Sequence, residues 1–206
     1  MSPAELDCVT VDAHGTLVRL VDPVPALASA LAERTVERRR EVVAAAFRVE
    51  VAHYVTHSSE GQDEPGLAQL QRDCARVFLE AADADLDPDE FAPVFASAMH
   101  FELLPGVVPA LERLRGLGLE LAVVANWDLS LHQLLDEVGL SGYFCAVVHA
   151  AGKPAPDGLR RALDRLGVEA GRALHIGDAE ADERAAAAAG MRFTPAPLPD
   201  AVTGLA

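Results

Sequence analysis

The first clear pattern along the chain is a short apolar run at residues 8–11, which ends at Asp12 and is followed by Gly15 and Thr16. An apolar run rich in β-branched residues predicts a buried strand, and Gly-Thr fits a tight turn after it. In open α/β sheets, ligands bind at the carboxyl ends of such strands. Asp12 could therefore be a nucleophile or a metal ligand, or it could cap the next turn; this stretch alone favours neither role.

Residues 22–99 have a different pattern, with helical periodicity and no convincing strand-like alternation. Asp22-Pro23 is typical of a helix start, because proline fits the first helical position. One helix is predicted to begin there, and three more are predicted over residues 37–55, 67–82 and 87–99. A polar, turn-rich loop is expected at residues 58–65. The pattern predicts a helical insert of about eighty residues.

From Pro105-Gly106 onward, strand and helix patterns alternate. Strands are predicted over residues 120–125, 144–149, 172–176 and 192–194. Helices are predicted over residues 107–117, 130–138, 158–166 and 183–189, followed by a proline-rich tail. Such alternation produces a parallel sheet with right-handed crossovers. We therefore expect an α/β fold: a doubly wound, Rossmann-like core of residues 1–18 and 103–206, with a helical unit inserted at residues 19–102.

Composition narrows the range of partners. Among 206 residues, 32 are acidic and 17 are basic, which gives a formal net charge of -15 at pH 7. This charge repels nucleic acids and anionic membranes, so we expect neither as a partner. No apolar run is long enough to span a bilayer, and the N-terminus lacks a signal-peptide pattern. Cys8, Cys74 and Cys145 are too few and too far apart for a disulfide framework, so a reducing, cytoplasmic location is expected.

Polar groups follow the carboxyl ends of four predicted strands. These groups are Asp12, the pair Ala125-Asn126, Lys153 and Asp178. Because the carboxyl ends of parallel strands meet at one edge of the sheet, we expect the four groups to converge. Each group alone is a weak signal, whereas the four in this order, with a helical insert after the first, are fairly specific.

This arrangement resembles the haloacid dehalogenase superfamily of hydrolases over nearly the whole chain. Four family motifs are matched, in chain order, by Asp12-Ala13-His14-Gly15-Thr16, Val123-Val124-Ala125-Asn126, Lys153-Pro154-Ala155-Pro156 and Gly177-Asp178-Ala179-Glu180-Ala181-Asp182. The position of the insert looks like the helical cap of subfamily I, which in this family closes over the active site. Asn126-Trp127-Asp128 and His175-Ile176-Gly177-Asp178 look most like the branch of haloacid dehalogenase-like domain-containing protein three.

The resemblance implies a phosphatase that uses Mg²⁺ and a small phosphorylated metabolite. Asp12 would attack phosphorus and form an aspartyl phosphate. Mg²⁺ would be held by the Asp12 carboxylate, the backbone carbonyl of His14 and Asp178. Asp182 would hold the water molecules of the metal. Hinges are then expected near residues 18–21 and 103–106, so that the cap can admit substrate.

The same resemblance assigns the groups that would bind phosphate. Lys153 would neutralise the charges of Asp12 and of the phosphate. Backbone N–H groups around Ala13, His14 and Asn126 would bind phosphate oxygens. We expect the enzyme to be a monomer or a homodimer.

Two positions depart from the family pattern. Family phosphatases carry a second Asp as general acid and base where this chain has His14. A nearby divalent cation opposes a positively charged imidazolium, so His14 is better suited to act as a base in the hydrolysis of the aspartyl phosphate. We hypothesise a preference for good leaving groups, such as acyl or aryl phosphates. Ala125 stands where the family has Ser or Thr; Asn126 could replace the lost phosphate contact, or it could orient a loop.

Two competing functions remain open. L-2-haloacid dehalogenases have Asp-Ala-Tyr-Gly-Thr-Leu in the first motif, similar to Asp12–Leu17 here, and they attack carbon without a metal. Asp178 and Asp182 favour the phosphatase instead, because two carboxylates beside Asp12 would repel one another without a cation. The substitutions at His14 and Ala125 would also fit a binding or regulatory protein built on an enzyme scaffold.

One pair of histidines has metal-like spacing. His53 and His57 lie four residues apart on a predicted helix, a spacing that can bind zinc. No third ligand is evident from the sequence, so a partly exposed helix face is the favoured interpretation.

Overall fold

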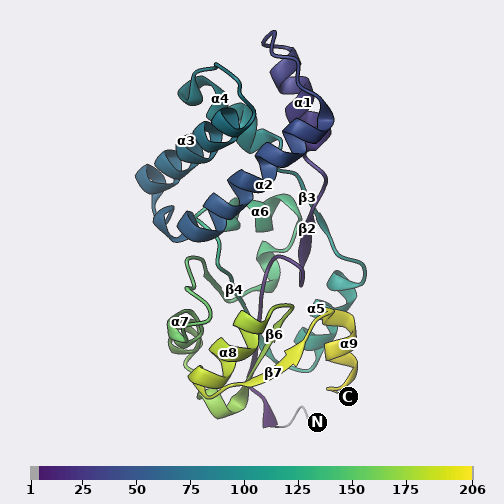
Figure 1. Cartoon of the computed structure of the whole chain (residues 1–206). Coiled ribbons are helices and arrows are strands. Elements are labelled where there is room, and N and C mark those ends of the chain that lie inside the picture. Colours follow the sequence, from purple (N-terminus) through teal and green to yellow (C-terminus); the bar gives the residue numbers. More distant parts are fainter. Residues whose placement is uncertain (1–4, 206) are drawn as a thin grey trace. The chain divides into compact units, whose positions relative to one another are not determined.

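The structure, a computed structural model, describes residues 5–205 (Figure 1). It consists of two compact units, one formed by Met1–Arg19 with Glu102–Ala206 and the other by Leu20–Phe101. We call these the core unit and the helical unit. The boundaries predicted from the sequence, between residues 18 and 19 and between residues 102 and 103, each lie one residue away from the observed ones.

The core unit contains a five-stranded sheet in the order β5-β4-β1-β6-β7, and every neighbouring pair of strands is parallel. The strands are β1 (Cys8–Val11), β4 (Glu120–Val124), β5 (Ala146–Val148), β6 (Ala173–Gly177) and β7 (Arg192–Pro195). All five expected strands are present, and β1 lies at the centre of the sheet. β1 is fully buried, which explains why its sequence is apolar apart from Thr10.

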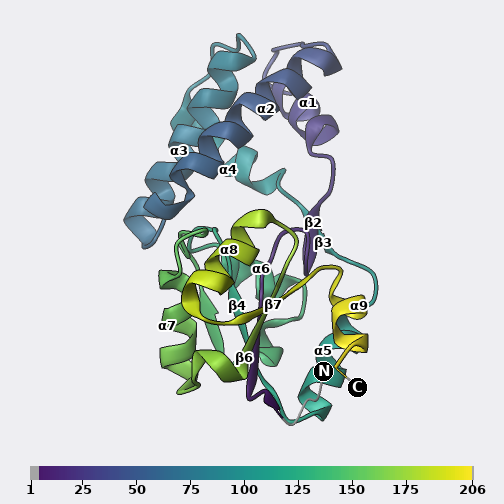
Figure 2. The ribbon, with the colours of Figure 1, turned by 60° about the horizontal axis from the view of Figure 1, so that its bottom comes forward.

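Helices cover both faces of this sheet, which confirms the doubly wound α/β fold (Figures 1 and 2). They are α5 (Val107–Gly116), α6 (Leu131–Glu137), α7 (Asp157–Leu166), α8 (Glu180–Ala189) and α9 (Leu198–Thr203), with 3₁₀ turns at Ser141–Tyr143 and Ala170–Arg172. Helices α7 and α8 share one apolar cluster with the sheet, in which Leu159 and Ala185 are fully buried. The alanines of α8 combine high helix propensity with small size, so this helix can lie close to the strands.

Helix α9 corrects the expected proline-rich tail. Pro199 lies in the first turn of α9, where proline is tolerated because the N–H that it lacks would have no partner within the helix. Leu198 and Val202 are buried, so the segment has an apolar face to pack. α9 lies beside α5 and contacts β6 and β7 (Figure 2).

The helical unit contains α1 (Val24–Ala32), α2 (Arg40–His57), α3 (Glu64–Ala81) and α4 (Pro88–Ser97), with a 3₁₀ turn at Ser58–Glu60 inside the expected loop. The side chains of Asp63 and Asp87 cap α3 and α4. The unit has its own apolar core, in which Phe78 and Phe91 stack with ring centroids 6.0 Å apart. Burying each such ring stabilises the unit by roughly 1.5–3 kcal/mol.

The segments expected to act as hinges are partly ordered as strands. β2 (Val18–Leu20) and β3 (Phe101–Leu103) form a two-stranded sheet. Within the core unit, the N–H of Leu104 donates to the carbonyl of Leu17 over 2.9 Å. Short, partly exposed strands carry little apolar periodicity, which is why the sequence pattern did not indicate them.

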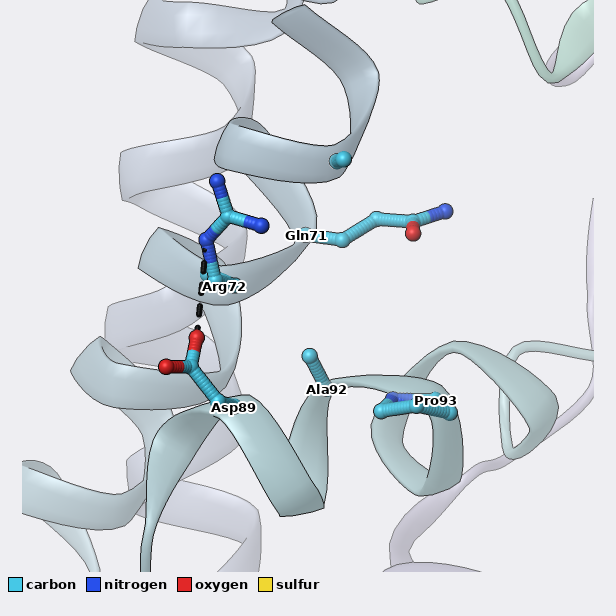
Figure 3. A pocket seen from close by; sticks show the side chains of 6 residues that line it. Gln71, Arg72, Asp89, Ala92 and Pro93 are labelled. Atoms are coloured by element: carbon cyan, nitrogen blue, oxygen red, sulfur yellow. Dashed lines mark ion pairs between the residues drawn. The ribbon is translucent and has the colours of Figure 1, made fainter. Parts of the chain in front are cut away.

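A shallow cavity of about 430 Å³ lies between α3 and α4 (Figure 3). The Arg72 guanidinium and the Asp89 carboxylate approach to 3.5 Å at its wall. The cavity contains none of the residues that the sequence analysis assigned to chemistry. Across the described residues, no helix is both long enough and apolar enough to cross a membrane.

Candidate active site

Asp12 is placed by the register of the three central strands. Val11, the last residue of β1, lies opposite Val123 on one side and Ile176 on the other. The N–H of Asp12 donates to the carbonyl of Ile176 over 2.9 Å, which fixes the backbone where β1 ends. Asp12 therefore sits between the ends of β4 and β6, at the edge of the sheet where the motifs were expected to meet.

Lys153 links two carboxylates that are far apart in the sequence. Its Nζ lies 2.5 Å from Oδ1 of Asp12 and 2.5 Å from Oδ1 of Asp182. The Nζ also donates to the carbonyl of Val124 over 2.9 Å. The side chains of Lys153, Asp12 and Asp182 are 4%, 11% and 2% exposed. A buried ammonium with three oxygen partners is fully satisfied, so it is held as a fixed positive charge.

Asn126 has a structural role that the sequence left open. Its side-chain amide donates to the carbonyl of Lys153, and its side-chain oxygen accepts from the N–H of Lys153, each over 2.8 Å. Of the two roles considered, the structure shows loop orientation. The amide oxygen and one amide N–H of Asn126 are used in this clamp.

Two glycines make room for the acidic groups. Gly15 has a φ of +76°, and a Cβ on it would lie 2.0 Å from Oδ2 of Asp178. A Cβ on Gly177 would lie 2.3 Å from Cγ of Asp182. Glycine is required at both positions because a carboxylate occupies the space of the missing side chain.

Asp12, Asp178 and Asp182 form an acidic cluster whose carboxylate oxygens lie within 4.8 Å of one another. Asp12 and Asp182 are buried and Asp178 is exposed. Lys153 supplies one positive charge against three negative ones, so the cluster retains an excess of negative charge. Carboxylate oxygens are the ligands that Mg²⁺ prefers, and a divalent cation would balance this excess. The residues present therefore fit the metal that the sequence predicted.

The two buried carboxylates have different electrostatic environments. Burial raises the pKa of Asp12, and the charge of Lys153 opposes that rise. Burial also disfavours ionisation of Asp182, but the hydrogen bond from His175 and the ammonium of Lys153 outweigh it and hold the pKa of Asp182 at about 2. Asp182 is thus a permanent anion at neutral pH, which suits a group that holds Lys153 in place.

The remaining predicted site residues surround this cluster. Ala13 and Ala125 are buried, and His14 is exposed. Ala13 also accepts N–H bonds from Leu17 and Val18 through its carbonyl, over 2.8 and 3.0 Å, so the turn after Asp12 is ordered. The structure thereby brings Asp12, Lys153, Asp178 and Asp182 together and leaves His14 available at the surface of the core unit.

His175 is a buried polar residue of the site that the sequence analysis left without a role. It lies in β6, is fully buried, and contacts Asp182 through Nε2 over 3.1 Å. A histidine inside a short apolar strand is itself a signal, because a buried polar group needs a partner. The sequence alone does not identify this partner, Asp182, which lies seven residues further along the chain.

The structure does not support a zinc site at the pair of His53 and His57. The rings of His53 and His57 stack with centroids 4.1 Å apart, and Nδ1 of His57 contacts the carbonyl of His53 over 2.8 Å. Over residues 5–205, the only group of three or more metal-type ligands close enough to share an ion is the acidic cluster. His53 and His57 are therefore still interpreted as part of a partly exposed helix face.

Comparison with known proteins agrees with this geometry. The family description "haloacid dehalogenase-like hydrolase" matches residues 6–190. The chain is 38% identical over 117 residues to haloacid dehalogenase-like hydrolase domain-containing protein 3 of Bos taurus, covering 52% of this chain and 47% of that protein. It is 30% identical over 198 residues to phosphoglycolate phosphatase 1 of Pseudomonas aeruginosa, covering 89% and 66%. The crystal structure of 2-haloacid dehalogenase from Pseudomonas syringae superposes with a TM-score of 0.65 at 27% identity, covering 91% and 85%.

The chain therefore belongs to the haloacid dehalogenase-like hydrolases. Its relatives include phosphatases, in agreement with the phosphatase motifs that the sequence resembles. The chain spans about half the length of the first curated relatives that it matches.

Proposed function

We propose that this hydrolase is a Mg²⁺-dependent phosphatase of a small phosphorylated metabolite. The observation that carries the proposal is the pairing of Lys153 with Asp12 and Asp182 inside the acidic cluster. A fixed ammonium beside a nucleophilic carboxylate suits attack on a phosphate, whose negative charge would otherwise oppose the approach of another anion. The third carboxylate, Asp178, suits a metal site.

Asp12 is the proposed nucleophile. One of its carboxylate oxygens forms a bond to phosphorus while the bond from phosphorus to the leaving-group oxygen breaks, which gives an aspartyl phosphate. Water then attacks the same phosphorus and releases Asp12 and inorganic phosphate. Lys153 orients Asp12 through Oδ1 and lowers the electrostatic cost of bringing a phosphate to it.

The metal would be held by the carboxylates of Asp12 and Asp178 and by the backbone carbonyl of His14, with Asp182 orienting the site from behind. When bound, Mg²⁺ supplies positive charge that stabilises the transferring phosphoryl group. Backbone N–H groups after Asp12 and β4 are the proposed partners of the other phosphate oxygens.

His14 determines which leaving groups the enzyme accepts. In the second step, an imidazole at this position accepts a proton from the attacking water. In the first step it is a poor proton donor beside a divalent cation, so the leaving group departs without a proton. We therefore propose acyl or aryl phosphates as the favoured substrates, with alkyl phosphates slower by about 10²–10⁴-fold.

A 2-haloacid dehalogenase is the second candidate. The similarity to a solved dehalogenase and the sequence Asp12–Leu17 support it. Against it stands the acidic cluster, because that reaction needs no metal and gains nothing from two further carboxylates beside its nucleophile.

A metal-dependent substrate screen tests the proposal. Hydrolysis of p-nitrophenyl phosphate, acetyl phosphate and glycerol phosphate would be measured with Mg²⁺ and with a chelator, beside halide release from 2-chloropropionate. We expect Mg²⁺-dependent hydrolysis of the first two substrates, slow hydrolysis of the third, and none by Asp12→Asn. Halide release in the presence of chelator would establish the dehalogenase. Absence of hydrolysis of all three phosphates and of halide release, with no change of the melting temperature in Mg²⁺, would overturn the proposal and favour a binding protein.

We also propose that the enzyme acts in the cytoplasm on free metabolites, as a monomer or homodimer. None of its three cysteines, all of which lie among the described residues, is in a disulfide, and Cys145 is exposed, which suits a reducing compartment.

A further inference from the structure

A chain of hydrogen bonds runs from the sheet interior to the proposed nucleophile. Oγ1 of Thr10, in β1, lies 2.8 Å from Nδ1 of His175, in β6. Nε2 of His175 lies 3.1 Å from Oδ1 of Asp182. The same Oδ1 is paired with Lys153, which is paired with Asp12. Thr10 and His175 are both fully buried and face each other across neighbouring strands.

The direction of these hydrogen bonds follows from the partners of each atom. Oδ1 of Asp182 already accepts from the Lys153 ammonium, so it faces His175 as an acceptor. The ring nitrogen that meets it, Nε2, must therefore carry the N–H. In this tautomer Nδ1 is an acceptor, and the Thr10 hydroxyl donates to it.

The contacts of Asp182 leave it little freedom to rotate. Oδ1 accepts from His175 and from Lys153, and Oδ2 accepts from the N–H of Ala179 over 3.1 Å. Gly177 brings the backbone so close to this carboxylate that a Cβ there would overlap it. Removing the bond from His175 would free Oδ1 to turn, and Lys153 would lose the partner that holds it beside Asp12.

We propose that His175, held in one tautomer by Thr10, is a positioning residue that orients Asp182 and thereby places Lys153 on Asp12. In the described part of the chain, the side-chain hydrogen bonds of His175 go to Thr10 and Asp182, so it acts on the proposed nucleophile through Asp182 and Lys153. A purely structural histidine would fill the same space without any requirement on which of its nitrogens donates. The proposal thus requires a donor at the Nε2 position in particular.

Two variants of similar polarity distinguish a positioning role of His175 from a purely structural one. In His175→Gln, the side-chain amide nitrogen reaches about as far as Nε2 and can still donate to Asp182. In His175→Asn, the amide reaches only as far as Nδ1 and can meet Thr10 but not Asp182. Both variants lose the imidazole ring, so both lose packing, and thermal unfolding measures that loss independently of the orientation of Asp182.

The activity measurement relies on the proposed phosphatase function. With p-nitrophenyl phosphate and Mg²⁺, we expect His175→Asn to lose about 10- to 100-fold in kcat with little change in KM. His175→Gln should recover most of that loss. Thr10→Val, which keeps the shape of the side chain and removes the donor to Nδ1, should lower kcat less than His175→Asn. Equal kcat values for the Gln and Asn variants would overturn the proposal.

A second measurement does not need activity. Long-range ¹H–¹⁵N spectra of the wild-type protein should show His175 as the neutral tautomer protonated at Nε2, and protonation at Nδ1 would overturn the proposal. If the wild type hydrolyses no phosphate ester, the proposed function fails while this inference is still tested. Crystal structures should then show Lys153 displaced from Asp12 in His175→Asn and in place in His175→Gln; an undisturbed Lys153 in both would contradict the inference.

Discussion

The carboxylate of Asp178 lies where a side chain at position 15 would be, because a Cβ on Gly15 would approach its Oδ2 to 2.0 Å. Gly15 of the first motif thus leaves the space that Asp178 of the fourth motif occupies. The turn after the proposed nucleophile can close only if residue 15 is a glycine, and its closure brings Asp178 into the acidic cluster. The relationship connects a sequence feature, the Gly-Thr turn, with the geometry of the proposed metal site.

Gly15→Ala should disrupt the metal site more than the fold. A left-handed backbone costs alanine about 1–2 kcal/mol, and the Cβ would also displace Asp178. Gly139→Ala is the matched control, since Gly139 has a φ of +72° and open space around its Cβ. Both variants should lose stability without metal, but only Gly15→Ala should lose the rise in melting temperature with Mg²⁺. An equal rise in both variants would contradict this assignment.

Lys153→Met should leave Asp12 and Asp182 buried without their cation. Breaking such a buried pair costs about 3–5 kcal/mol of unfolding free energy. Mg²⁺ should restore more stability to this variant than to the wild type, because it would then be the main positive charge in the acidic cluster. Urea unfolding with and without Mg²⁺ measures both quantities. The exposed Arg113→Met is a control that should change stability by less than about 0.5 kcal/mol.

Asn126 should affect catalysis through Lys153 and not through phosphate binding. Asn126→Ala removes both hydrogen bonds to the Lys153 backbone, which costs about 1–3 kcal/mol in stability. We expect kcat to fall while the inhibition constant of inorganic phosphate stays nearly constant. Asn126→Asp keeps the acceptor and should fall between Ala and wild type in stability. A large weakening of phosphate inhibition in Asn126→Ala would show instead that the side chain contacts the ligand.

Glu50 makes the stability of the protein depend on pH. This residue of α2 is 4% exposed, and burial raises its pKa to about 7 although the Cys74 thiol donates to it. The native state therefore binds an extra proton between the unfolded pKa of about 4.3 and pH 7. Its contribution is complete below pH 4.3 and decreases as pH rises through 7, by about 4 kcal/mol in total.

Glu50→Gln should remove this part of the pH dependence, since the amide does not titrate. The difference in unfolding free energy between variant and wild type isolates Glu50 from the other titrating groups. It should shift in favour of the variant as pH rises from 5 to 8. A difference that is constant over this range would mean that Glu50 is ionised in the native protein at both values.

The fold was predictable because its signals are local and strong. Buried strands such as β1 and β4 are mostly apolar runs, and α1 and α4 begin at Asp-Pro pairs, so their positions follow from short segments. β2, β3 and α9 were missed for the opposite reason. The two strands have only three residues each, and the start of α9 contains prolines that also fit an irregular tail.

The acidic and basic groups of the candidate site were predictable from the sequence, but the hydrogen bonds that hold them in place were not. Asp12, Lys153 and Asp178 each follow a strand end, and the topology of a parallel sheet brings such residues together. The bond from His175 to Asp182 depends on the angle at which α8 leaves β6. The clamp of Asn126 on Lys153 depends on the path of the loop after β5. Neither hydrogen-bond arrangement can be predicted from the spacing of residues in the sequence.

The central claim is that Asp12 carries the phosphoryl group during turnover. The most direct test is to quench the reaction with acetyl phosphate and Mg²⁺ in acid and to map the modified peptide by mass spectrometry. We predict phosphate on the peptide containing Asp12, in an amount that falls when Mg²⁺ is omitted, and no label in Asp12→Asn. Turnover of acetyl phosphate with phosphate on another residue, or with an equal rate in the Asp12→Asn variant, would contradict the account.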